Sequence, residues 1–371
     1  MMEKISKLIL AHNPVTTCNF RCAYCYITQH KQFDNALPVF PYSAEEIRKA
    51  LSQKRLGGPC YINTCGGGET LIPHETVDYV RELLLEGHYV EIVTNGSLKK
   101  RFEEIVNTYP QEALERLIIK FSFHYEELVR LNLMDVFFEN VHLVQQAGCS
   151  FTIEMTVFDS LVPKIPEIKR IFQEKMGTDV LCHLTVGRKD NDPNIPIMTD
   201  YSLDEYKNIW SSFDSDMFKF KLSTYYVKRK EFCYAGAWSF YLDLGNGYAR
   251  KCYNQGNGVN IFQKVDEPIH LPPVGHGCKL PHCYNSHALL TFGLIPELDT
   301  PTYAQMRNRV DASGNEWLTP KVKTFFSSKL KDRNKEYSEM KKKVVTIGNR
   351  LRDITTRGNH AILRIVKKRR G

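Results

Sequence analysis

The first 190 residues alternate short apolar segments with segments of helical periodicity, and this alternation constrains the fold more than any other feature. The predicted strands are 8–11, 60–64, 89–94, 117–123, 151–157 and 180–186. The helices predicted between them are 44–53, 74–85, 101–106, 134–146 and 164–175. Strands and helices in this rhythm form parallel βα units. The sequence therefore predicts an α/β protein built on an open, partial (β/α)6 barrel that is TIM-like.

Polar residues alternate with apolar ones on three of these strands. The polar sets are Lys120, Ser122 and His124; Thr152, Glu154 and Thr156; and His183 and Thr185. Because successive side chains of a strand point to opposite faces, we interpret the polar face as the wall of the barrel cavity. His124, Glu154 and His183 are then candidate catalytic residues that bind substrate or move protons.

Three cysteines, Cys18, Cys22 and Cys25, lie within eight residues, just after the first predicted strand. A short loop with this spacing can hold three irons of one 4Fe–4S cluster through thiolates, which leaves one iron open to a substrate or cofactor. The alternative is a structural zinc site, with His12 or His30 as the fourth ligand.

A glycine-rich turn follows the second predicted strand and reads Cys65-Gly66-Gly67-Gly68-Glu69-Thr70. Glycines let the backbone approach a ligand closely, and the carboxylate can accept a hydrogen bond from a ligand ammonium group. Like the cysteine triplet, the turn lies after a strand, where parallel barrels gather their chemistry.

The triplet and the turn together resemble the signature of the radical S-adenosylmethionine (SAM) superfamily. The resemblance implies that the open iron binds SAM and that the reduced cluster cleaves it to methionine and a 5′-deoxyadenosyl radical, which abstracts a hydrogen atom. It also implies that the aromatic residue before the third cysteine lies against the adenine. The residues expected to bind SAM, including two chosen from their strand positions, are Tyr24, Gly66, Gly67, Gly68, Glu69, Ser122 and Arg188.

Cys65 has the strand parity of Tyr61 and Asn63, so its thiol is predicted to face the cavity. A thiol there could return a hydrogen atom to a substrate radical, as radical epimerases require. The alternative is an inert buried cysteine, the commoner fate of this residue type.

A second group of four cysteines follows the barrel segment: Cys233, Cys252, Cys278 and Cys283. The first two flank a predicted β-hairpin that turns at Gly245-Asn246-Gly247. This arrangement resembles the auxiliary-cluster extension of SPASM and Twitch radical SAM enzymes, although four residues separate the last pair where the family usually has two. We expect one auxiliary 4Fe–4S cluster, Twitch-like, that carries electrons. The alternative is a four-cysteine zinc site, in which His276 or His282 could replace a thiol.

The chain divides into predicted regions: a barrel (1–190), a bridge without a recognised motif (191–228), an auxiliary-cluster domain of hairpin and helix (229–300), and a C-terminal helix with a basic tail (301–371). The last 31 residues hold eleven Lys or Arg and one acid, a net charge of +10, so the rest of the chain carries −2 against +8 for the whole. The tail could contact an anionic membrane surface, RNA or another polyanion, or it could simply be solvated. A helix is predicted to start at Thr319-Pro320 and to pack on the barrel.

The eleven cysteines cluster at metal-like spacings, and no signal peptide or membrane span is evident, so we expect a cytoplasmic, oxygen-sensitive enzyme. The triplet begins 18 residues into the chain, which leaves no room before it for a leader-peptide-binding domain. We therefore expect a compact polar substrate, such as a sugar, aminocyclitol or nucleotide-linked sugar, and its oxidation or epimerisation. The implied electron donor is of the flavodoxin or ferredoxin type. Peptide modification is the main alternative; an RNA-modifying enzyme and a non-catalytic zinc-binding protein are further ones.

Overall fold

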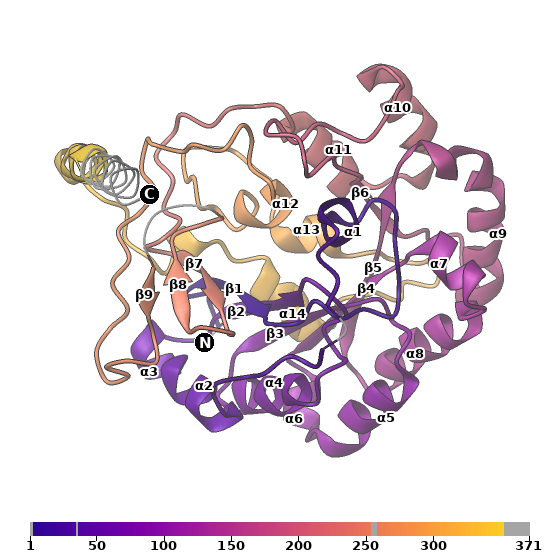
Figure 1. Ribbon diagram of the computed structural model, residues 1–371, viewed down its shortest axis with the longest axis horizontal. Coiled ribbons are helices and arrows are strands. Elements are labelled where there is room, and N and C mark those ends of the chain that lie inside the picture. The colour runs from indigo at the N-terminus through magenta and orange to yellow at the C-terminus, as the bar shows by residue number, and fades with distance from the viewer. Residues whose placement is uncertain (1–2, 35, 254–257, 352–371) are drawn as a thin grey trace, which may run out of the picture.

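A curved, nine-stranded sheet organises the computed structural model, which describes residues 3–34, 36–253 and 258–351 (Figure 1). Its first six strands are β1 (Leu8–Asn13), β2 (Tyr61–Gly66), β3 (Tyr89–Thr94), β4 (Leu117–Ser122), β5 (Ser150–Val157) and β6 (His183–Val186). Each pairs in parallel with the next in chain order. The predicted α/β class with a parallel core is thus confirmed, although β6 begins three residues later than expected.

Helices cover the outer face of this sheet (Figure 1). They are α2 (Ala44–Ala50), α3 (Gln53–Leu56), α4 (Glu75–Leu85), α5 (Lys99–Thr108), α6 (Gln111–Leu114), α7 (Tyr125–Arg130), α8 (Met134–Gln146) and α9 (Ile165–Met176). Apolar residues of the strands face them: the ring of Phe121 lies 5.4 Å from that of Phe102 and 5.5 Å from that of Phe137, centroid to centroid. A single helix was predicted over 44–53, but the structure has two helices there, because the chain turns at Leu51 and Ser52.

The predicted hairpin extends the same sheet. Strand β7 (Ser239–Asp243) pairs in parallel with β1, on the side opposite β2, and pairs antiparallel with β8 (Tyr248–Arg250), which in turn pairs with β9 (Val259–Asn260). Gly247 takes a positive φ of 74° in the turn, a conformation that glycine adopts without strain. The hairpin is therefore built onto the barrel sheet through backbone hydrogen bonds, which fixes its position relative to the cysteine loop after β1.

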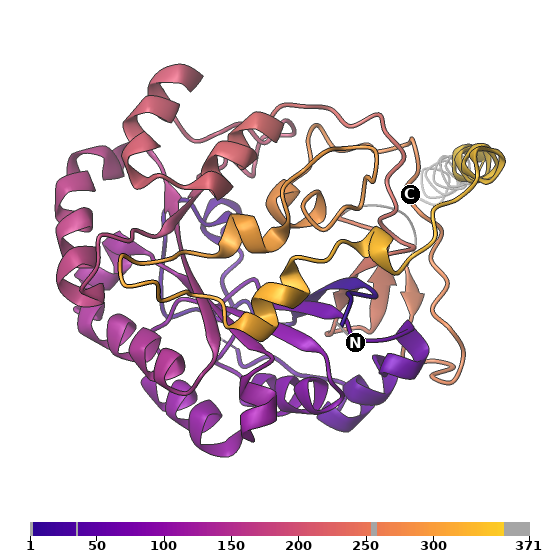
Figure 2. The same cartoon turned by 180° about the vertical axis from the view of Figure 1, so that it is seen from behind.

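The C-terminal region crosses the amino ends of the strands (Figure 2). Its helices are α13 (Tyr303–Arg307) and α14 (Pro320–Phe326), with Thr319 as N-cap of α14, as predicted, while α12 (Ser286–Leu289) precedes them in the chain. The ring of Phe325 stacks on that of Tyr89 at 3.8 Å, so α14 packs against the first residue of β3. This region closes one end of the sheet and leaves the carboxyl ends, with their loops, for the site.

The bridge folds into α10 (Leu203–Trp210) and α11 (Asp216–Thr224), neither of which was predicted. Ser202 and Glu205 form a capping box at the start of α10, and the spacing Ser-x-x-Glu was a readable signal for it. A further helix occupies 339–351. The rest of the predicted basic tail, from residue 352 onward, lies outside the described residues. Within the described part of the chain, no helix has both the length and the apolar character needed to cross a bilayer.

Candidate active site and second cysteine site

The backbone of the cysteine loop is hydrogen-bonded directly to the backbone of the glycine turn. The Gly68 N–H donates to the Val15 carbonyl (2.8 Å) and the Glu69 N–H donates to the Thr17 carbonyl (2.9 Å). A Cβ on Gly68 would lie 1.9 Å from the Thr17 carbonyl oxygen, which is far inside contact distance. Position 68 therefore accepts only glycine, and the turn holds the loop that carries Cys18 and Cys22.

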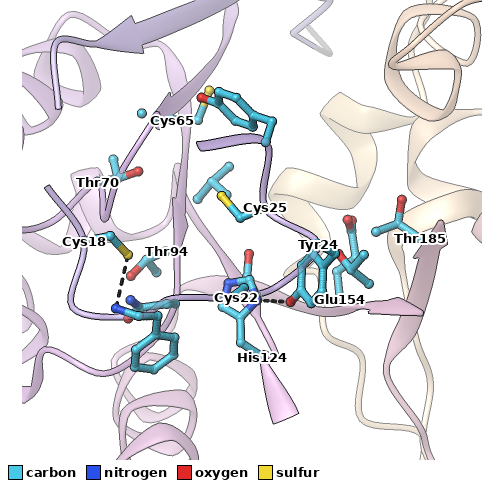
Figure 3. A pocket seen from close by; sticks show the side chains of 18 of the residues that line it. Cys18, Cys22, Tyr24, Cys25, Cys65, Thr70, Thr94, His124, Glu154 and Thr185 are labelled. Atoms are coloured by element: carbon cyan, nitrogen blue, oxygen red, sulfur yellow. Dashed lines mark hydrogen bonds between the residues drawn. The ribbon is translucent and has the colours of Figure 1, made fainter. Parts of the chain in front are cut away.

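The three thiols of this loop line one cavity at the carboxyl ends of the strands (Figure 3). Burial raises the pKa of Cys18 to about 11 and also raises the pKa values of Cys22 and Cys25. Thiols with raised pKa values stay protonated unless a positively charged group compensates, and iron would do so. Within the described residues no group of three or more His, Cys, Asp or Glu side chains is arranged to hold a metal ion. His12 and His30, the ligands considered for zinc, line a different cavity.

Glu69 is held by protein groups on both carboxylate oxygens. It accepts hydrogen bonds from the Thr94 hydroxyl (2.6 Å), the Asn95 N–H (2.7 Å) and the Leu71 N–H (3.1 Å). A carboxylate offers about four acceptor positions, so one is left for a ligand ammonium group. Fixing the loops after β2 and β3 is thus the main structural role of Glu69, which the sequence alone did not indicate.

The polar strand faces form the cavity wall towards the carboxyl ends of the strands, whereas Thr152 and His183 of the predicted sets do not line this cavity. The cavity that contains the three thiols is also lined by Tyr24, Gly66, Gly67, Gly68, Glu69, Lys120, Ser122, His124, Glu154, Thr156, Thr185 and Arg188. The predicted SAM-binding residues therefore surround the cysteine loop in space, although they come from four different strands and the loops after them.

Tyr24 and His124 contact each other within this cavity, and the Tyr24 hydroxyl is hydrogen-bonded to His124 Nδ1 (Figure 3). Burial lowers the pKa of His124 to about 4 and raises the pKa of Tyr24 well above its usual value. Both groups are therefore neutral near pH 7, and the hydroxyl donates to the ring nitrogen. The bond fixes the Tyr24 ring beside Phe158, at a centroid distance of 5.0 Å.

Glu154 forms two buried ion pairs, with Lys120 Nζ at 3.1 Å and Arg307 Nη1 at 2.7 Å. Burial alone would raise its pKa, but the charges of Lys120 and Arg307 outweigh burial and hold the pKa well below the usual value. A carboxylate held ionised in this way is a weak base. The geometry supports a positioning or substrate-binding role for Glu154 and not the proton-transfer role that we considered.

The placement of His183 in the cavity is wrong. Its strand parity matches that of Thr185, which does line the cavity, but His183 lies at the amino end of β6. There its Nε2 is hydrogen-bonded to the Arg307 carbonyl (2.9 Å) and its ring lies edge-on to Trp317. The strand pattern predicted the correct face of the sheet for His183. Its position along the strand keeps it out of the cavity, because the C-terminal region fills this end of the sheet.

Cys65 lies where the first cavity meets a second one. It lines both, together with Tyr26, Gly66, Lys120 and Arg188. The second cavity continues towards the hairpin and is lined further by His12, Asn63, Glu91, Tyr241, Tyr253 and Tyr284. Burial raises the pKa of Cys65 to about 11, so the group present is a thiol with its hydrogen. Arg188, at the junction, pairs with Asp190 at 3.2 Å.

The sequence did not predict all of the residues that line the first cavity. Lys221 on α11 and His287 on α12 line the first cavity. Lys221 comes from the bridge, which has no recognised motif, and His287 follows the last cysteine of the predicted auxiliary-cluster domain. Lys221 is only 5% exposed, and no acidic side chain among the described residues forms an ion pair with it. Lys120, in contrast, was predicted on the polar face of its strand, and it lines the cavity.

The second group of cysteines converges on one apolar cavity. Cys233, Cys252, Cys278 and Cys283 all line it, with leucine and isoleucine side chains around them. Burial raises the pKa of Cys252 to about 12 and that of Cys283 well above its usual value, and neighbouring thiols raise them further. The four thiols thus share one largely apolar cavity. Neither His276 nor His282 lines this cavity; His276 Nδ1 is bonded to the Lys230 carbonyl (2.9 Å) and His282 packs on Tyr225.

The structure shows an α/β domain with a three-thiol loop and a glycine turn at the carboxyl ends of parallel strands. Residues 12–168 match the model of the Radical SAM superfamily, and these residues contain both motifs and β2 to β5. This part of the chain is thus similar to the Radical SAM superfamily, whose members bind a 4Fe–4S cluster and SAM and use radical chemistry.

Solved structures give a more distant likeness. The crystal structure of Streptococcus suis SuiB bound to S-adenosylmethionine matches with 16% identity and a TM-score of 0.47, over 70% of this chain and 65% of that one. Native anSMEcpe with bound AdoMet matches with 14% identity and a TM-score of 0.48, over 70% and 79%. BtrN in complex with AdoMet and 2-DOIA matches with 12% identity and a TM-score of 0.38, over 72% and 82%. The chain thus spans about two thirds of the length of SuiB, and no curated protein matches it.

Proposed function

We propose that this chain is a radical SAM oxidoreductase or epimerase that acts on a compact polar substrate. The observation that carries the proposal is the pair of adjoining cavities: one contains the three thiols and the glycine turn, and the other, which shares Cys65 and Lys120, is walled by tyrosines and polar side chains. The first has the residues expected to hold a cluster and SAM, and the second is the place for a substrate.

The proposal assigns roles to residues that line the first cavity. Cys18, Cys22 and Cys25 would hold the cluster, and Tyr24, Gly66, Gly67, Gly68, Ser122 and Arg188 would position SAM. When bound, the cluster and SAM supply a carbon-centred radical that removes one hydrogen atom from the substrate. The buried amine of Lys221 favours an anionic group on the substrate, such as a carboxylate or phosphate, because it lines the cavity and forms no ion pair with a described residue.

Oxidation and epimerisation differ in what happens after hydrogen abstraction. Oxidation of a carbinol also releases a hydroxyl proton and one more electron, and the four-thiol cavity supports an auxiliary, Twitch-like 4Fe–4S cluster as the electron acceptor. Epimerisation instead needs a hydrogen atom from the protein, and Cys65 carries one at the junction of the two cavities. The thiyl radical left on Cys65 would then take one electron, supplied by the external reductant, and one proton to restore the thiol. Both proposals include an external flavodoxin- or ferredoxin-type reductant and a cytoplasmic, oxygen-poor setting.

The first test is anaerobic reconstitution of the full chain, followed by iron counting and electron paramagnetic resonance with and without SAM. We expect about eight irons per chain and about four in Cys18→Ala/Cys22→Ala/Cys25→Ala, with a signal that SAM shifts only in the wild type. Stoichiometric zinc without iron would overturn the enzyme assignment.

Substrate classes are then separated by 5′-deoxyadenosine release in the presence of phosphorylated or nucleotide-linked sugars, aminocyclitols and peptides. Stimulation by the small polar compounds supports the proposal, and stimulation by peptides alone would replace it with peptide modification. In heavy water, deuterium at the reacting carbon of the product, lost in Cys65→Ala, would distinguish epimerisation from oxidation.

A further inference from the structure

The helix over 339–351 presents an apolar stripe to solvent. Met340, Val344 and Ile347 are 78%, 64% and 57% exposed, and Leu351, 60% exposed, continues the same spacing. Steps of four, three and four residues place these side chains on one face of a helix. Figures 1 and 2 show this helix at the edge of the molecule, beyond the hairpin strands and away from the sheet.

The opposite face of the helix fixes its orientation on the body. Asn349 Nδ2 donates to the carbonyls of Pro273 (2.9 Å) and Val274 (3.1 Å), and its Oδ1 accepts from Lys251 Nζ (2.8 Å). Val345 packs against the core beneath the hairpin. The exposed stripe therefore points away from the molecule as a consequence of specific contacts on the other side.

Cations flank the stripe on both sides. Lys343 and Arg350 lie on one flank and Lys341 on the other, and all three are exposed. The only acid of the helix segment, Glu339, is engaged with Lys342 at 2.9 Å. Beyond the helix the sequence supplies seven more Lys or Arg and one Asp in residues 352–371.

We infer that this stripe, Met340, Val344, Ile347 and Leu351 with its flanking cations, docks the protein on an anionic lipid bilayer. An apolar face with basic flanks lies in the plane of a membrane interface, with the apolar side chains at the acyl boundary and the cations at anionic headgroups. Lys and Arg stems reach the headgroups while their methylenes cover apolar surface.

Two other occupants fit less well. A second copy docked through the same stripe would bring Lys341, Lys343 and Arg350 against their own equivalents, which like charge opposes. RNA would pair with the cations, but the stripe offers no aromatic ring for base stacking and its aliphatic side chains would stay unburied. An anionic bilayer satisfies both the charge and the apolar surface.

The test is flotation of the full-length chain with vesicles of phosphatidylcholine, with and without phosphatidylglycerol, at low and high salt. We expect binding to the anionic vesicles that weakens with salt, and little binding to phosphatidylcholine alone. Val344→Glu/Ile347→Glu should lower the apparent affinity by about tenfold or more, because each change removes apolar area and adds repulsion.

The matched control is Leu203→Glu/Val310→Glu, which makes the same charge change at two residues that are 45% and 53% exposed elsewhere. It should float like the wild type, and circular dichroism should show both double variants folded. The inference is overturned if the wild type does not float with anionic vesicles, or if the two double variants float alike. Sedimentation showing a dimer that only Val344→Glu/Ile347→Glu disrupts would also overturn it, in favour of self-association. Binding to single-stranded RNA that this variant leaves intact, without flotation, would favour a polyanion instead.

Discussion

Glu154 on β5 accepts a hydrogen bond from Arg307 on α13 at 2.7 Å, between side chains that are 153 residues apart in sequence and almost fully buried. The same guanidinium donates to the Thr152 hydroxyl (2.7 Å) and lies 3.8 Å from Glu91 on β3. The C-terminal region is thereby tied to the inner face of the sheet, directly beneath the cavity.

We predict that Arg307→Met destabilises the fold by about 3–5 kcal/mol, because it leaves two buried carboxylates without their shared cation. Chemical denaturation of the wild type and the variant measures this. Lys99→Met, which removes one partner of an exposed pair with Glu139, is the control and should change stability little. Equal losses in the two variants would show that the buried network does not stabilise the protein.

Gly68→Ala should abolish the cluster of the cysteine loop. The added Cβ meets the Thr17 carbonyl at 1.9 Å, so either the loop or the turn must move. We expect about four irons instead of about eight after reconstitution, and no SAM-dependent signal. Gly177→Ala, at a position where a Cβ meets nothing within 4 Å, should keep full iron despite its positive φ of 65°. Full iron in Gly68→Ala would show that the loop tolerates the displacement.

The second cysteine site should hold its own cluster. Cys233→Ala/Cys252→Ala should lose about four irons while the SAM-shifted signal persists, because the cysteine loop is left intact. Cys149→Ala/Cys182→Ala removes two buried thiols that line neither the thiol-loop cavity nor the four-thiol cavity, and should keep all iron. A wild-type count of about four irons, unchanged in Cys233→Ala/Cys252→Ala, would remove the auxiliary cluster from the mechanism.

Lys221→Met should raise stability and weaken substrate binding at once. Burial lowers the pKa of Lys221 to about 7, so the folded protein disfavours the charged amine, and a methionine of similar shape removes that cost. We expect a melting temperature higher by a few degrees, equivalent to at least about 1 kcal/mol. The KM for an anionic substrate should rise about tenfold or more while SAM binding is unchanged. A lower melting temperature would mean that Lys221 is paired in the folded protein.

Acid should destabilise the protein through its buried neutral histidines. Burial lowers the pKa of His88 from 6.5 to about 4. In the neutral ring, Nδ1 accepts a hydrogen bond from the Cys60 N–H (3.1 Å). Between these pH values the unfolded chain binds more protons than the folded one, so stability is full above pH 6.5 and falls as the pH drops towards 4. His88 alone accounts for about 3 kcal/mol of that loss.

The measurement is the unfolding free energy from urea titrations across this pH range. His88→Gln removes one titrating group, so its stability should fall less steeply with acid than that of the wild type, even if it is lower at neutral pH. The control is His142→Gln, which makes the same substitution at a partly buried histidine on the outer helix α8. Identical slopes in all three proteins would assign the acid sensitivity to other groups.

The sequence by itself determined the parallel α/β core, the cysteine loop, the glycine turn and the polar face of each strand. These features are local: side-chain alternation, ligand spacing and glycine at a close approach are all encoded within a few residues. The same alternation correctly grouped Ser122, Glu154 and Thr185 around one cavity, since parallel strands bring equivalent faces together.

Only the tertiary structure decided whether each of those side chains reaches the cavity and which distant groups contact it. His183 and Thr185 share a parity, yet α13 and the segment after it fill the amino end of the sheet and bury His183 against Trp317. Arg307 and Lys221 reach the strands from distant segments without a motif, and Arg307 turns Glu154 from a candidate base into a fixed anion. Such contacts depend on how the chain packs over long separations, and burial then sets the charge of each group, which no local pattern of residues encodes.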